Sequence, residues 1–83
     1  MSAMLTGNQI RIARFALRWS VKDFSEKTGV PVRTVKRIEA SDAVPASNAS
    51  TIDAMRRCLE AAGIEFIGTP EDRPGIRIGT PKS

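Results

Sequence analysis

The sequence predicts an all-α fold of four to five short helices with a short β-hairpin at the C-terminal end. Up to residue 62, apolar residues recur at intervals of three and four, which is the spacing of one face of an α-helix. Hydroxyl or amide residues that can cap a helix precede most of these segments. After residue 63 the apolar residues alternate or nearly alternate with other residues, as they do in β-strands.

The first helix is predicted from about residue 7 to residue 18. Thr6 is a suitable N-cap, and Gln9 stands where its side chain can complete a capping box. The stripe that this helix turns toward the core consists of Ile10, Ala13 and Leu17. Phe15 and Trp19 are expected to lie in the core rather than to stack on nucleic-acid bases.

A glycine separates the second and third predicted helices. The second helix starts after Ser20, which can cap the amide of Asp23 and bind that carboxylate at its own amide. Gly29 ends the helix because glycine tolerates the positive φ of a helix C-cap. The third helix follows over residues 31–40, and Pro31 suits its entrance because proline has no amide to leave unpaired. The two helices and the glycine form a helix-turn-helix.

The third helix separates apolar from cationic residues. Val35 and Ile38 face the core, and Val30 in the preceding turn fills the space between the two helices. The other side of the helix carries Val32, Arg33, Thr34, Lys36 and Arg37. Three of these residues are cations and none is acidic, so the sequence predicts an exposed cationic helix face.

A last helix is predicted to close the hydrophobic core. It begins at Asn48 or Thr51 and ends near Ala62, where Gly63 is placed as a C-terminal cap. The candidates for its N-cap are Ser47, Asn48 and Ser50.

The C-terminal hairpin is expected to use residues 64–67 and 75–79 as strands, with a turn-rich loop between them. A two-stranded hairpin is marginally stable alone, so it packs on the helices or pairs across the twofold axis of a dimer, and we favour the dimer. The expected parts of the chain are an N-terminal arm (1–6), a helix-turn-helix domain (7–63), the hairpin as a dimerisation element (64–79) and a disordered tail (80–83).

Charge and composition narrow the class of partner. The 83 residues are 41% hydrophobic, which suits one compact domain. A net charge of +4 and a pI near 10.0 favour a polyanionic partner. The acidic residues that gather toward the C-terminus are Glu60, Glu65, Glu71 and Asp72. Positive charge is therefore concentrated on the helix-turn-helix.

The sequence gives no basis for an enzyme, a cofactor or a metal site. It contains no histidine, which excludes Ser/His/Asp and Cys/His catalysis and zinc sites built on imidazole. Cys58 has no partner for an internal disulfide and is expected to be structural. No stretch approaches the ~20 apolar residues of a membrane span, and the N-terminus lacks a signal-peptide pattern. We therefore expect a cytoplasmic protein without membrane contact.

The helix-turn-helix resembles the XRE family of transcriptional regulators, which are related to Cro and the phage repressors. The residues that carry the resemblance are Phe24, Ser25, Gly29, Val30, Val35, Ile38 and Glu39. It extends from about Ile10 to Ala62 and implies a lambda-repressor-like DNA-binding domain. It also implies a structural ion pair between Arg14 in the first helix and Glu39 at the end of the third.

The resemblance implies which side chains contact DNA. Val32, Arg33 and Arg37 match the base-reading positions, and Lys36 is a further candidate. The residues expected to contact phosphate are Arg11, Lys22 and Thr34. Arginine can bind guanine through two hydrogen bonds, and Val32 can contact a thymine methyl group.

The function implied is that of a sequence-specific double-stranded DNA-binding regulator, a repressor that acts as a homodimer on a palindromic operator. Two alternatives stay open. The protein can be the antitoxin of a toxin-antitoxin pair, with a tail that binds the toxin. It can also be a protein-interaction module that kept the fold without DNA binding, because Val21 stands where the family commonly has glutamine and Asp42 lies in a loop where DNA-binding relatives often have a cation.

Overall fold

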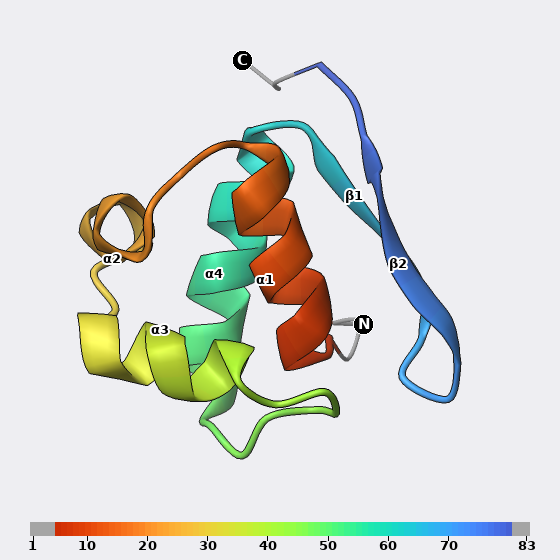
Figure 1. Cartoon of the computed structure of the whole chain (residues 1–83), viewed down its shortest axis with the longest axis horizontal. Coiled ribbons are helices and arrows are strands. Elements are labelled where there is room, and N and C mark those ends of the chain that lie inside the picture. Colours follow the sequence, from red (N-terminus) through yellow and green to blue (C-terminus); the bar gives the residue numbers. More distant parts are fainter. Residues whose placement is uncertain (1–4, 81–83) are drawn as a thin grey trace.

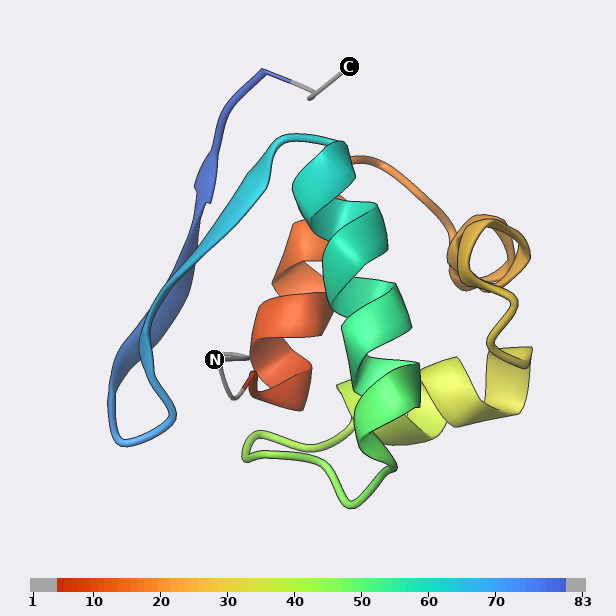
Figure 2. The same cartoon turned by 180° about the vertical axis from the view of Figure 1, so that it is seen from behind.

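The computed structural model describes residues 5–80, which form four helices and a two-stranded sheet. In chain order the elements are α1 (Gly7–Ala16), α2 (Val21–Thr28), α3 (Val32–Glu39), α4 (Ala49–Ala61), β1 (Ile64–Thr69) and β2 (Asp72–Ile78). Helices α1 and α4 lie side by side in the middle of the molecule (Figures 1 and 2). Helix α2 and the start of α3 lie on one side of them, and the hairpin of β1 and β2 lies on the other.

The predicted all-α class is wrong, because the hairpin is built into the folded core. Strands β1 and β2 pair antiparallel, with Ile64 opposite Ile78 and Phe66 opposite Ile76. Ile64 is buried, and Phe66 and Ile76 pack against the core. Strand β2 contacts α1 and β1 contacts α4, so the sheet covers apolar surface that the helices alone would leave exposed. The chain is an α+β fold.

A buried glutamine fastens the hairpin to the helices. The side-chain nitrogen of Gln9 donates to the carbonyl of Ile67 at 3.1 Å and to that of Gly75 at 2.9 Å. Its side-chain oxygen accepts the backbone amide of Thr6 at 3.0 Å. The residue that completes the capping box of α1 therefore also holds both strands.

The core draws on every element except β2. Its buried apolar residues are Leu5, Ile10, Ala13, Phe24, Val30, Val35, Ile38, Met55, Leu59 and Ile64. Within the segment predicted as an N-terminal arm, Leu5 is in this core and residues 1–4 lie outside the described part. Residues 81–83 of the predicted tail also lie outside it. Among the described residues, no helix has the length and apolar character needed to cross a membrane.

The helix starts follow the local signals in the sequence. Thr6 and Gln9 form one capping box, and Ser20 and Asp23 form another. Of the candidates for the N-cap of α4, Asn48 fills the position and accepts the amide of Thr51. Side chains thus pair backbone amides that a helix start leaves without partners.

Helix α1 ends earlier than predicted, and one of its aromatic residues is not in the core. The helix stops at Ala16, two residues before the predicted end, and Arg18 itself has a φ of 61°, which lies outside the helical region. Phe15 is 65% exposed, so the expectation that it is buried is wrong. Its ring lies beneath the guanidinium of Arg14, with 4.8 Å from Cζ to the ring centroid. Trp19 is half-buried and packs against the core.

Candidate nucleic-acid interface

Helix α3 is amphipathic with a cationic outer side. Val35 and Ile38 are fully buried, which turns the opposite side of the helix toward solvent. The exposed side chains of α3 are Val32, Arg33, Lys36 and Arg37, whereas Thr34 is half-buried. The four residues predicted to read bases therefore share one accessible face.

The turn before α3 is fixed by hydrogen bonds. Gly29 has a φ of 78°, and its amide donates to the carbonyl of Ser25 at 2.8 Å. The hydroxyl of Ser25 donates to the carbonyl of Val30 at 2.6 Å, and the amide of Val30 donates to the hydroxyl of Thr28 at 3.2 Å. The side chain of Val30 is buried between the helices. These contacts set the angle at which α3 leaves α2.

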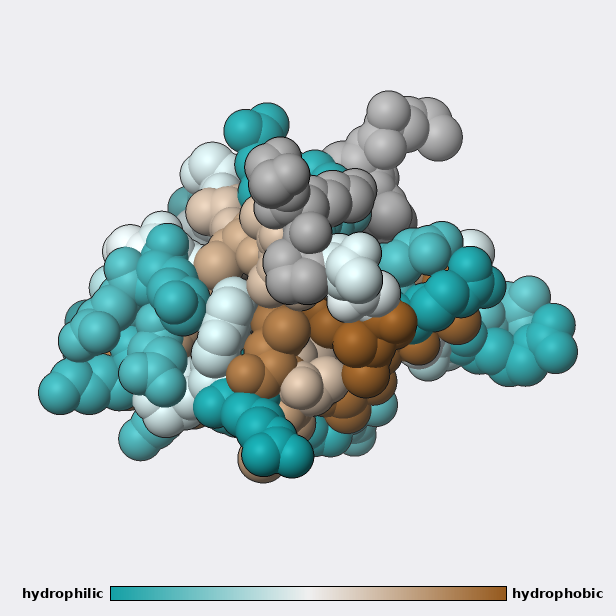
Figure 3. Space-filling model, turned by 90° about the horizontal axis from the view of Figure 1, so that it is seen from above, coloured by the Kyte–Doolittle hydropathy of each residue, from teal (hydrophilic) through white to brown (hydrophobic). Residues whose placement is uncertain are grey.

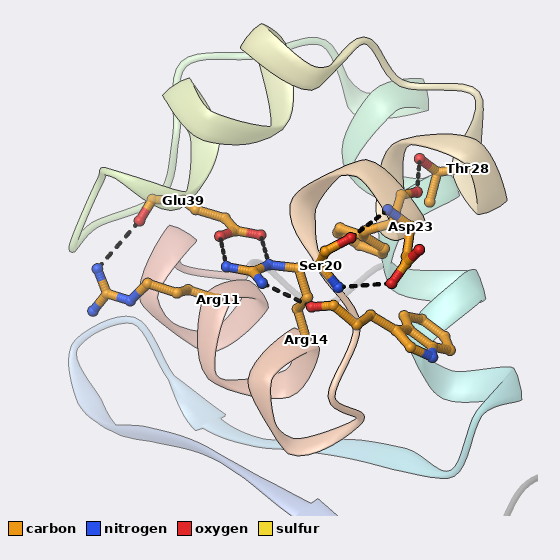
Figure 4. A network of polar contacts seen from close by, with 8 residues as sticks. Arg11, Arg14, Ser20, Asp23, Thr28 and Glu39 are labelled. Atoms are coloured by element: carbon orange, nitrogen blue, oxygen red, sulfur yellow. Dashed lines mark hydrogen bonds and ion pairs between the residues drawn. The ribbon is translucent and has the colours of Figure 1, made fainter.

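A buried ion pair fixes the other end of α3. Nε of Arg14 lies 2.8 Å from Oε2 of Glu39, and Nη2 lies 2.9 Å from Oε1, so the pairing is bidentate (Figure 4). Nη1 of Arg14 also donates to the carbonyl of Trp19 at 2.8 Å. The pair that the family resemblance implied is present, and it links α1, α3 and the connection before α2.

Arg11, predicted to contact phosphate, has partners within the protein. Its Nη1 donates to the carbonyl of Glu39 at 3.4 Å, and its Nη2 contacts the side chain of Asn8. The first contact places a cation at the carboxyl end of α3, where helix carbonyls lack partners. Lys22, the other predicted phosphate-binding cation, is exposed at the start of α2.

Arg37 is exposed but already has one partner. Its Nη1 donates to the carbonyl of Ala46, in the connection between α3 and α4, at 2.8 Å. A guanidinium has five donors, so four stay available to a ligand. This contact ties the side chain to the connection between α3 and α4. No residue type in the sequence could have signalled it, because a backbone carbonyl is the acceptor.

The unpaired cations are all in the first half of the described chain. Residues 5–40 carry eight basic residues (Lys and Arg) and three acidic residues (Asp and Glu). Residues 41–80 carry four basic and six acidic residues. Within the described residues, seven cations have no carboxylate within ion-pair distance, namely Arg11, Arg18, Lys22, Lys27, Arg33, Lys36 and Arg37. The cations of α4 and the hairpin each pair with an acid. Helices α1 to α3 therefore hold uncompensated positive charge.

Lys27 was not among the predicted site residues. It lies at the end of α2, and its Nζ stands 4.8 Å from the ring centroid of Trp19. A cation–π contact of this kind keeps the ammonium group on the surface of α2 without neutralising it. No clear signal in the sequence marked this residue, because Glu26 directly precedes Lys27 and Asp23 lies one helical turn before it.

The described residues hold no cluster of three potential metal ligands among His, Cys, Asp and Glu. Burial raises the pKa of the Cys58 thiol, and the charge of Lys27 only partly opposes this rise. A half-buried cysteine with a raised pKa stays protonated near neutral pH and is a poor nucleophile.

Comparison of the chain with protein-family models, curated proteins and solved structures finds no match. The interpretation of α3 as a nucleic-acid-binding helix therefore depends on the residues and geometry described above. Its main support is the cationic face of α3, fixed at one end by the turn and at the other by the Arg14–Glu39 pair.

Proposed function

We propose that this protein is a sequence-specific regulator of transcription that binds double-stranded DNA and represses by occupying a palindromic operator as a homodimer. The observation that carries the proposal is the exposed cationic side of α3, held at a fixed angle by the turn at Gly29 and by the Arg14–Glu39 pair. An α-helix with its side chains is about 10 to 12 Å wide and fits the major groove, which is about 12 Å wide.

In the proposed complex, α3 lies in the major groove and reads base edges. Arg33 and Arg37 each have enough free donors to bind guanine at two points, and Val32 presents apolar surface for a thymine methyl group. Lys36 lies on the same side of the helix and reaches a neighbouring base or phosphate. A guanine-containing half-site follows from two arginines on one face.

Phosphate contacts position the domain on the duplex. Lys22 projects from the start of α2, and Thr34 lies on α3 beside the cationic side chains. The charge of Arg11 adds to the field at the end of α3 while its hydrogen bonds stay within the protein. These contacts supply affinity for any sequence, whereas the base contacts supply specificity.

Selection from random duplexes, followed by binding of variants to the selected sequence, tests this function. Replacing Arg33 or Arg37 with alanine should cost about 1 to 3 kcal/mol in binding and relax the preference at one base pair. The matched control is Arg57→Ala, because Arg57 is an equally charged, 75% exposed side chain on α4 that pairs with Asp53. The control should bind nearly as the parent does.

Two results would contradict the proposal. If no duplex is enriched, or if affinity does not fall as salt rises, the chain is not a DNA-binding protein and the interaction-module alternative takes its place. If a duplex is enriched but neither arginine variant changes affinity or preference, α3 is not the element that reads it.

A further inference from the structure

The two most exposed large apolar side chains of the described residues lie on α1 and β2, two elements that contact each other. Phe15 is 65% exposed on the last turn of α1, and Ile78 is 63% exposed at the end of β2. Ile12 lies one turn before Phe15 on the same side of α1, and Ile76 shares a sheet face with Ile78. We call these four residues the apolar strip. Figure 3 shows hydrophobic surface in the middle of the molecule and toward the hairpin side, with hydrophilic surface on both flanks.

Strand β2 also has an open edge beside the apolar strip. Gly79 donates its amide to the carbonyl of Gly63 at 2.7 Å, and hydrogen-bonded pairs alternate along an antiparallel ladder. The other hydrogen-bonded pairs are therefore Glu65 with Arg77 and Ile67 with Gly75. The backbone groups of Ile76 and Ile78 point away from β1, and within the described residues they make no other backbone hydrogen bond. An unpaired strand edge of this kind favours pairing with another strand.

Proline limits this edge to a short stretch. Pro74 is on β2, two residues before Ile76, and has no amide to donate. The free edge of β2 therefore consists of the amides and carbonyls of Ile76 and Ile78. Two such edges satisfy each other when the strands run antiparallel about a twofold axis, because each supplies both donors and acceptors.

Charge and position favour a second copy of this chain as the occupant. Residues 64–78 contain two cations and three acids, and Arg73 and Arg77 pair with Asp72 and Glu65 within the hairpin. Two copies that meet there avoid the repulsion expected between two surfaces from residues 5–40, where cations outnumber acids by eight to three. The apolar strip carries no charge, so it can contact its own copy. The hairpin also lies on the side of α1 and α4 away from α2 (Figures 1 and 2).

We propose that two copies of this protein associate through the free edge of β2 and the apolar strip, forming a four-stranded antiparallel sheet. The homodimer is part of the proposed function, and this inference names the surface that forms it. A standard interface buries about 800 Å² per partner. The free edge of β2 offers only two residues, so we expect a smaller interface than this and a weak dimer.

Sedimentation equilibrium of the full chain without DNA tests the surface. The parent should change from monomer to dimer as its concentration rises from micromolar to millimolar. Ile78→Glu should weaken association by roughly tenfold or more, because it places a carboxylate in an apolar contact. The matched control is Val44→Glu, which makes the same change at a 40% exposed side chain in the connection between α3 and α4. It should dimerise as the parent does.

Two more variants separate the contributions of the strip and the edge. Phe15→Ser removes apolar surface without altering β2, and Ile78→Pro removes an outward amide while keeping an apolar side chain. Both should weaken the dimer, and circular dichroism should show that each variant remains folded. If Ile78→Glu weakens association but Ile78→Pro does not, the four-stranded sheet is wrong.

A parent chain that stays monomeric at millimolar concentration would overturn the proposal and leave the strip to a different protein, such as a toxin. Unchanged association of Ile78→Glu would overturn it as well. The sedimentation assay contains no DNA, so its failure says nothing about DNA binding by α3. DNA binding by α3 is measured separately, as binding of a monomer to a duplex that carries one half-site.

Discussion

The carboxylate of Glu39, the last residue of α3, is held at two points by the guanidinium of Arg14 in α1. Both side chains are nearly closed to water, at 9% and 6% exposure. Phe15 covers the guanidinium from outside, and the carbonyl of Trp19 accepts a third hydrogen bond from it. The orientation of the proposed recognition helix therefore depends on a charge pair that the protein shields from solvent.

Removing one member of this pair should destabilise the protein strongly. Glu39→Gln or Arg14→Leu leaves the other charge buried without its partner, which costs about 3 to 5 kcal/mol. Urea denaturation followed by circular dichroism measures the loss. The double variant Arg14→Leu/Glu39→Leu should lose much less than the two single losses combined, because no charge remains buried. Additive losses would show that the pair does not act as a unit.

Gln9 should control the attachment of the hairpin separately from the start of α1. In Gln9→Glu the carboxylate can still accept a hydrogen bond from the amide of Thr6. The side-chain nitrogen that donates to the carbonyls of Ile67 and Gly75 is replaced by an oxygen, which cannot donate and is repelled by both carbonyls. We expect a loss of about 1 to 3 kcal/mol. Hydrogen exchange should show faster exchange in β1 and β2 and unchanged protection in α1. Equal loss of protection in both would contradict this division of roles.

The features that the sequence predicted are those set by residues close together in the chain. The capping boxes at Thr6 and Ser20 span three residues each, and the turn at Gly29 needs one residue that accepts a positive φ. Helical spacing likewise predicted that the cations of α3 share an exposed side. Such signals depend on local geometry, which the order of residues largely determines.

The features that the sequence did not predict depend on contacts between distant segments. Gln9 reaches residues 58 and 66 positions away, and these contacts with the hairpin make the all-α class wrong. The acceptors for Gln9 in the hairpin and for Arg37 at Ala46 are backbone carbonyls. Every residue has such a carbonyl, so the residue types in the sequence do not indicate these contacts. Phe15 is apolar, yet it lies two residues after the buried Ala13, which turns it about 200° away from that side of α1 and into solvent.

The capping box at Ser20 should make stability depend on pH in the acid range. Hydrogen bonds from the backbone amide and side chain of Ser20 lower the pKa of Asp23 below its usual value. A carboxyl group with a lowered pKa in the folded state stabilises the fold above its unfolded pKa of about 3.9, and that contribution is lost as the pH falls through the folded value. The free energy of unfolding should therefore decrease less steeply below about pH 4 in Asp23→Asn than in the parent.

Asp42→Asn is the control for this pH dependence. It removes a carboxylate from an exposed site where Asp42 makes no hydrogen bond within the described part of the chain. Urea denaturation across a pH series should give Asp42→Asn the acid slope of the parent. If Asp23→Asn and the parent lose stability with the same slope, the carboxylate of Asp23 does not support the start of α2.

The proposed division between phosphate and base contacts makes Lys22 and Arg33 respond differently. Lys22→Ala should weaken binding to all duplexes alike and reduce the slope of log affinity against log salt by about 0.9, the value for one lost phosphate contact. Arg33→Ala should instead weaken the selected duplex more than a scrambled one. Both side chains are exposed and neither pairs with an acid among residues 5–80, so removing either leaves no buried charge behind. Titration of both duplexes at several salt concentrations measures the two effects, with Arg57→Ala as the control for net charge. A change in base preference in Lys22→Ala would place α2, rather than α3 alone, in contact with the bases.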